Sequence, residues 1–226
     1  MTGFHLAYER NFDTLLLDSI NFLLDAGELH PSDDKGQAFS RASIIYSLLL
    51  LEAAANTCIE HLDLERSVHS EIDRLPVLAK FDFYLRTRFS QRSIERGARQ
   101  IESLKELRSL RDGMVHLKAH KVDWIGDPEA GMSAEAVRTK SLKVATNPKF
   151  WDIADATSTA RGVHAFLSYF FRDKCRYGPK MVASLLFSES SVPGDDNHFY
   201  PCMSKEARSK LRARGIDVTY IKIAWA

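Results

Sequence analysis

Residues 42–55 constrain the fold more than any other segment, because they are apolar at nearly every position and Glu52 is their one charged residue. A helix that is apolar all round must pack against neighbours on several sides. The run is shorter than the ~20 residues that span a bilayer, so it predicts a buried central helix at about residues 40–62 rather than a membrane anchor. Replacing Ile45 or Leu49 by Asp is expected to abolish folding, because an unpaired buried carboxylate costs several kcal/mol.

Three further stretches carry the spacing of amphipathic helices. Apolar residues recur at intervals of three and four in residues 8–26, 90–110 and 150–176. A break at Pro76 is followed by an aromatic-rich stretch that predicts a short helix or turn. We therefore expect a mainly α-helical fold, a bundle of four to five long helices.

Two segments depart from the helical pattern. Residues 119–149 are rich in Gly and Pro, and predict an irregular insertion with one short strand at 141–145. The segment 187–226 predicts a loop at 188–197, a short basic helix at 204–214 and an alternating β-like run at 216–225. That run could pair with residues 182–187, with the segment near Leu142 or with a second subunit. We expect residues 1–186 to form one helical domain, with the tail packed on it.

Composition excludes several classes of protein. Three cysteines in 226 residues are few and odd in number, which argues against a disulfide framework. Residues 1–10 lack the basic and apolar stretches of a secretory leader, so we expect a cytoplasmic protein without a membrane segment. Cys58 with His61, and His198 with Cys202, lack the second close pair of a zinc site. No metal and no cofactor are expected.

The segment 107–118 reads L-R-S-L-R-D-G-M-V-H-L-K and places Arg111, a polar Asp112 and His116 at the end of a predicted amphipathic helix. The central helix reads L-L-L-L-E-A-A-A-N at 48–56. Together they resemble the HEPN superfamily, in its arginine–polar–histidine motif and in its buried second helix with an embedded glutamate. The resemblance covers about half of the chain. Asp112 stands where asparagine is commoner, and the insertion and the tail lie outside the resemblance.

The resemblance implies a helical bundle that dimerises, so that Arg111 and His116 of both subunits line one cleft that cleaves RNA without a metal. The chemistry suits these residue types. His116 would be the general acid or base, because imidazole titrates near neutral pH. Arg111 would bind the scissile phosphate and stabilise charge in the transition state. Five residues on a straight helix leave the two side chains about 140° apart, so either Gly113 distorts the helix or a dimer completes the cleft.

Several neighbours are candidates for supporting roles. Glu52 is either a core-edge residue that reaches solvent or a residue that orients Arg111 or a neighbouring helix. Asn56 lies one turn on and could share a polar cluster with Glu52. Residues 80–121 carry four Lys and seven Arg against five Asp or Glu. That excess is either a solvated helix face or a phosphate-binding footprint, with RNA contacts expected from Arg108, Lys118, His120 and Lys121.

The sequence therefore favours a metal-independent endoribonuclease that acts as a homodimer. It would cleave single-stranded RNA to 2′,3′-cyclic phosphate ends. By analogy with the family it would serve as a toxin or defence effector, with an antitoxin or regulatory protein as a partner. The alternative is a non-catalytic dimeric module that binds nucleic acid, nucleotide or a protein partner.

Overall fold

Helix α2 (Asp34–Glu60) is the centre of the fold, as the apolar run predicts. It contacts α1, α3, α4, α5, α6 and α7 in the computed structural model, which describes residues 10–31, 33–115, 123–127, 131–187 and 200–226. The helix begins six residues earlier than expected. Asp33 caps it by accepting a hydrogen bond from the Lys35 backbone N–H. This cap stabilises the first turns, which are polar and were not expected to be helical.

The packing of α2 is less symmetrical than its composition predicts. Leu50 is fully buried, whereas Leu49 is 40% exposed and Ile45 is only partly buried. The expectation that Leu49 lies in the core is therefore wrong. Among the described helices, α2 alone is long and apolar enough to cross a membrane, and 61% of its most apolar window is buried against the rest of the fold.

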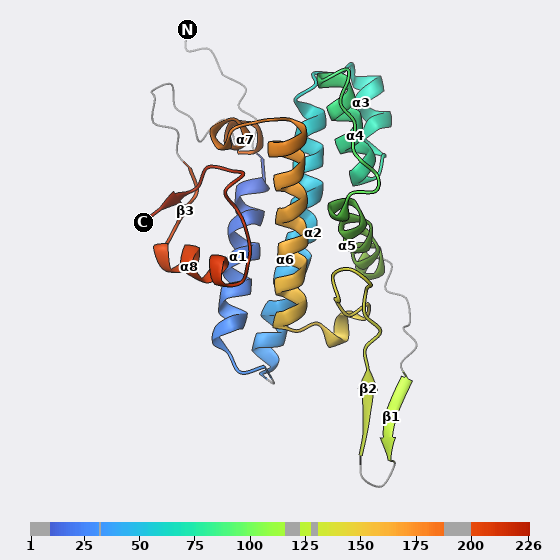
Figure 1. Cartoon of the computed structure of the whole chain (residues 1–226), viewed down its shortest axis with the longest axis vertical. Coiled ribbons are helices and arrows are strands. Elements are labelled where there is room, and N and C mark those ends of the chain that lie inside the picture. The colour runs from blue at the N-terminus through green and yellow to red at the C-terminus, as the bar shows by residue number, and fades with distance from the viewer. Residues whose placement is uncertain (1–9, 32, 116–122, 128–130, 188–199) are drawn as a thin grey trace.

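Two long helices flank α2 in the bundle (Figure 1). Helix α1 (Phe12–Glu28) packs along it, and the Ser43 hydroxyl of α2 donates to the Ser19 carbonyl of α1. Helix α6 (Ile153–Ser168) starts with a capping box between Asp152 and Asp155 and continues into the π-helix η2 (Tyr169–Lys174). Together α6 and η2 cover residues 153–174 of the helix predicted at 150–176. The mainly α-helical class is thus confirmed.

Helix α5 (Arg99–Val115) starts nine residues later than predicted. The preceding residues form an irregular segment, because Arg92 donates to the Lys174 and Cys175 carbonyls and the Ile94 N–H is taken by the Asp82 carboxylate. At its other end α5 passes through Gly113 without a break. Gly113 therefore does not distort the helix within the described residues, which contradicts one of the two explanations for the motif spacing.

The stretch after Pro76 is a full helix, α4 (Val77–Arg88), preceded by the short surface helix α3 (Arg66–Asp73). Phe81 on α4 lies fully buried, with its ring centroid 5.0 Å from that of Phe166 and 4.5 Å from that of Phe170. This aromatic cluster fastens α4 to α6 and η2. Aromatic packing explains why the segment folds as a helix rather than a turn.

The expected irregular insertion contains an antiparallel hairpin of β1 (Asp123–Asp127) and β2 (Gly131–Glu135), which extends away from the bundle (Figure 1). The predicted strand at 141–145 is wrong. Its backbone N–H groups bond to side chains, with Ser141 and Leu142 donating to Glu106 and Ala145 to Asp155. The strand-like pairing in this segment is one isolated antiparallel bridge between Ala145 and Arg138. The 3-10 turn η1 (Pro148–Phe150) follows it.

The C-terminal part packs on the same core. It comprises α7 (Pro179–Leu186), β3 (Cys202–Met203), α8 (Lys205–Ala213) and β4 (Ala224–Trp225). The predicted basic helix is confirmed as α8, capped by Ser204. The predicted partner at 182–187 is wrong because that segment is helical. Only the last residues of the alternating run form a strand, which pairs in parallel with β3 rather than with any partner that the sequence suggests.

The alternation at 216–225 nevertheless reports burial. Ile216, Val218 and Tyr220 are buried with exposed polar residues between them, and Ile221 and Ile223 are buried on either side of the exposed residue 222. A turn interrupts the segment where the Ile221 N–H bonds to the Val218 carbonyl, so most of these side chains reach the core without a neighbouring strand. A period of two thus indicates a chain segment packed against an apolar surface, which is a weaker statement than a sheet.

Candidate functional site

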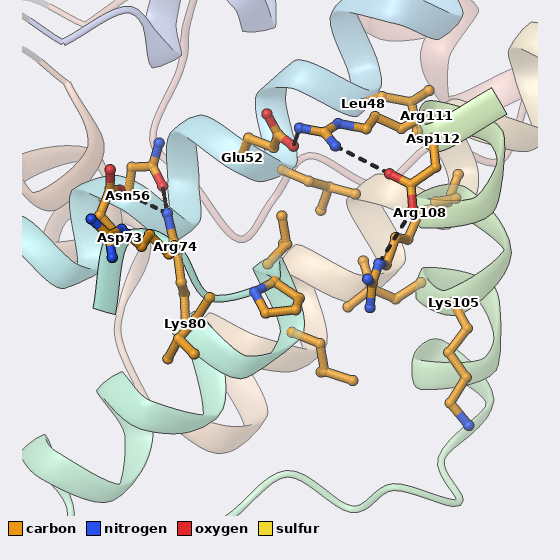
Figure 2. A pocket seen from close by; sticks show the side chains of 17 residues that line it. Leu48, Glu52, Asn56, Asp73, Arg74, Lys80, Lys105, Arg108, Arg111 and Asp112 are labelled. Carbon is orange, nitrogen blue, oxygen red and sulfur yellow. Dashed lines mark hydrogen bonds and ion pairs between the residues drawn. The ribbon is translucent and has the colours of Figure 1, made fainter. Parts of the chain in front are cut away.

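A pocket of about 470 Å³ lies between α2, α4 and α5, and it gathers the five candidate site residues that lie in the described part of the chain (Figure 2). Its apolar lining comes from Leu48, Leu51, Leu75, Pro76, Val77, Leu78, Leu104 and Leu107. Its polar lining comes from Glu52, Asn56, Asp73, Arg74, Lys80, Lys105, Arg108, Arg111 and Asp112. Pockets that bind small molecules or nucleotides combine an apolar wall with a few polar groups in this way.

Arg111 is held by two carboxylates. Its Nη2 lies 2.6 Å from Oε1 of Glu52, and its Nη1 donates to Oδ1 of Asp112 at 3.1 Å. The Arg111 side chain remains 38% exposed and that of Glu52 28%. The guanidinium is therefore fixed in orientation but open on one side. A planar fork fixed in this way can still offer N–H groups to a phosphate.

The chain of charges continues to Arg108, one turn earlier on α5. Its Nε lies 3.6 Å from Oδ2 of Asp112, so that carboxylate sits between two guanidinium groups (Figure 2). Asp112 both positions the arginines and neutralises part of their charge. An anionic ligand would have to compete with it.

A second polar cluster lies at the other end of the pocket. Lys80, of which only 6% is exposed, donates to Oδ1 of Asn56 at 2.7 Å and to Oδ1 of Asp73 at 2.8 Å. The hydrogen bond and charge of Lys80 lower the pKa of the Asp73 carboxyl. Asn56 lines the same pocket as Glu52 but accepts its hydrogen bond from Lys80 of α4, in a cluster apart from the ion pair of Glu52. Sequence reasoning missed Lys80 and Asp73, because nothing in their spacing reports that α3 and α4 pack beside Asn56.

The structure places the predicted residues unevenly. Glu52, Asn56, Arg108, Arg111 and Asp112 line one pocket. The predicted residues His116, Lys118, His120 and Lys121 lie outside the described residues, and α5 ends one residue before the histidine.

The charge in the pocket is largely compensated. Its five cationic side chains face three carboxylates from the lining itself, and the outermost two cations pair with neighbours, Arg74 with Glu71 and Lys105 with Glu102. The lining alone carries two more cations than carboxylates, and these two neighbouring glutamates balance that difference. Because most of these pairs are exposed, each contributes at most about 1 kcal/mol and can be exchanged for a ligand contact.

Metal-ligating side chains do not cluster in the part of the chain that the structure describes, where no group of three or more His, Cys, Asp or Glu could hold an ion. Cys58 lies in the core, where burial raises the pKa of its thiol well above the usual value. The chemistry available in the pocket is that of cations, carboxylates and an amide.

Comparisons with known proteins add no family to this picture. No protein-family model, no curated protein and no solved structure matches the chain. Functional inference therefore depends on the motif and on the pocket that surrounds it.

Proposed function

We propose that this protein is a metal-independent endoribonuclease of the HEPN type that cleaves single-stranded RNA. The observation that carries the proposal is the arrangement of Arg111, which Glu52 and Asp112 orient in an open pocket at the end of α5. The glutamate comes from the central helix, and His116 follows α5 directly in sequence. These are the elements in which the chain resembles HEPN proteins.

The reaction would use the ribose 2′-hydroxyl as nucleophile. Its oxygen forms a bond to phosphorus while the bond from phosphorus to the 5′-oxygen breaks, which gives a 2′,3′-cyclic phosphate and a 5′-hydroxyl. One group takes the proton of the 2′-hydroxyl and another protonates the leaving oxygen. We assign one of these transfers to His116, because neutral and protonated imidazole are both accessible near pH 7. Arg111 would stabilise the charge that develops on the phosphoryl oxygens.

A homodimer is part of the proposal. On a straight helix, residues 111 and 116 point about 140° apart, and α5 is unbroken through Gly113. Pairing the motif of one subunit with that of its partner would bring histidine and arginine together around one phosphate. Two-fold symmetric dimers are also the commonest homo-oligomers. A cytoplasmic role as a toxin or defence effector, with a regulatory protein partner, remains a prediction from the family analogy and from cysteine usage.

The test is cleavage of single-stranded RNA by the purified protein in excess EDTA. We expect 2′,3′-cyclic phosphate ends and no cleavage of DNA, which lacks the 2′-hydroxyl. His116→Ala should reduce the rate by about 10²–10⁴-fold through loss of proton transfer, and Arg111→Ala by about 10²–10³-fold through loss of charge stabilisation.

Arg86→Ala is the matched control, since Arg86 is a half-exposed arginine that pairs with Asp82 outside the pocket. It should cleave like the wild type. Cleavage that persists in both motif variants and stops with EDTA would point to a metal-dependent nuclease. Intact RNA with wild-type protein free of copurifying inhibitor would favour the non-catalytic binding module.

A further inference from the structure

A second groove lies on the C-terminal part of the chain, outside the region that resembles HEPN proteins. Its volume is about 560 Å³, and it runs between α8 and residues 215–225. In Figure 1, α8 and α5 lie on opposite sides of α6, so the groove is separate from the pocket around Arg111.

The local chain geometry builds the groove. Gly215 adopts a positive φ of 68°, and the N–H of Ile216 bonds to the Leu211 carbonyl, which turns the chain sharply at the end of α8. This is the usual use of glycine after a helix. The following residues then run back along α8 and bury their apolar side chains beneath the groove. Pairing of β3 with β4 fixes the far end.

The rim of the groove carries three cationic side chains, Arg208, Arg212 and Lys222. Within the part of the chain that the structure describes, none of the three pairs with a carboxylate. The acid on the same rim, Asp217, is engaged elsewhere, because Thr219 donates to its Oδ1 and Arg172 lies 3.8 Å from its Oδ2.

This arrangement differs from the first pocket, where each lining cation has a carboxylate within 4.0 Å. Neighbouring Lys210 on α8 is likewise paired, with Glu28 and Glu206. Cations gathered at one concave surface attract anions, and among the described residues these three have no carboxylate partner to give up on binding. The rim therefore favours an anionic ligand.

Trp225 gives the ligand a second recognition element. It lines the same groove, is partly exposed, and has the Arg208 guanidinium 5.4 Å from its ring centroid. An indole beside a planar guanidinium is a surface on which a nucleobase can stack, and such stacking is worth about 1–3 kcal/mol per base. The combination of phosphate-binding cations and a stacking ring matches a nucleotide.

We propose that this groove binds a nucleotide, with its phosphate on Arg212 and Lys222 and its base against Trp225 and Arg208. The nucleotide is either free or part of a single strand. The proposal does not depend on ribonuclease activity. The volume of the groove, about 560 Å³, lies within the range of about 300–1,000 Å³ for small-molecule pockets.

The experiment measures binding of ATP by calorimetry, and of fluorescein-labelled (dT)8, which has no 2′-hydroxyl to be cleaved, by anisotropy. We expect Arg212→Ala/Lys222→Ala to weaken ligand binding by about tenfold or more. The slope of log affinity against log salt concentration should become shallower by about one unit per cation removed. Lys205→Ala, an exposed cation on α8 outside the groove, should bind like the wild type.

Two further arms make the assignment specific. Trp225→Ala should weaken the binding of ATP and of (dT)8 while leaving the affinity for pyrophosphate unchanged. The loss of affinity caused by Arg212→Ala/Lys222→Ala should also be seen when these changes are made in Arg108→Ala/Arg111→Ala protein, in which the first pocket is disabled. Tighter binding of (dT)8 than of ATP identifies a strand as the ligand, and the reverse identifies a free nucleotide. Absence of saturable binding up to roughly millimolar concentration, or equal affinity in the wild type and the double variant, overturns the proposal.

Discussion

His164 should make the stability of this protein fall between neutral and mildly acidic pH. The imidazole is fully enclosed on α6, where its Nδ1 lies 3.1 Å from the hydroxyl of Tyr220. Burial lowers the pKa of His164 from 6.5 to about 4, and the charge of Asp217 acts in the opposite direction. In the unfolded chain the ring would titrate at its ordinary value.

The direction of this change in unfolding free energy follows from proton uptake by the unfolded chain. Between pH 6.5 and pH 4 the unfolded chain binds a proton that the folded protein excludes, so the contribution of His164 is complete above pH 6.5 and is lost as the pH falls. One pKa unit corresponds to 1.36 kcal/mol. The free energy of unfolding should therefore drop by about 2 kcal/mol between pH 7 and pH 5 from this residue alone.

Urea denaturation followed by circular dichroism at the two pH values measures this loss. His164→Gln removes the titration while keeping an amide that can bond to Tyr220, so its stability should fall by about 2 kcal/mol less than that of the wild type over the same interval. His69→Gln, a change on the exposed helix α3, is the matched control and should follow the wild type. Equal losses in the wild type and in the His164 variant would refute the reasoning.

Four further predictions concern the pocket, the core and the assembly. Glu52→Gln should lower the cleavage rate by about 10- to 100-fold through misorientation of Arg111 with little change in Tm, and an unchanged rate would exclude that role. Asp112→Asn should tighten binding of a 2′-O-methyl RNA up to about fivefold by removing a competing charge, as measured by anisotropy. Leu50→Asp should unfold the protein at a cost of several kcal/mol, whereas Leu49→Asp should retain a cooperative melt. Light scattering at micromolar concentration should give the mass of a homodimer, and a monomer would count against the shared cleft.

The sequence predicts the long helices well because their signals are local. Apolar residues at intervals of three and four mark α1 and α6, and a continuous apolar run marks the core of α2. The start of α5 was not predictable in this way. It is set by Arg92, which reaches carbonyl groups about 80 residues further along the chain, and no local pattern reports such a bond.

In the candidate site, too, local sequence features were predictable and tertiary contacts were not. An ionisable Glu52 in an apolar helix already suggests a partner, and the structure places Arg111 there. The contact of Asn56 with Lys80 depends on the packing of α4 against α2, which the periodicity of either helix leaves undetermined. Local chemistry thus indicated individual groups, and tertiary packing decided which of them meet.

The π-helical turn η2 makes chain length at the end of α6 more important than residue identity. There the N–H of Cys175 bonds to the carbonyl of Phe170, five residues earlier, and the consecutive rings of Tyr169, Phe170 and Phe171 are all buried. Deleting one residue would allow ordinary helical bonding to return, but would rotate everything downstream by about 100° relative to the aromatic cluster. Helix α7 and the chain that follows would then lose their register on the core. Substitutions among similar rings should be tolerated here far better than a single-residue deletion.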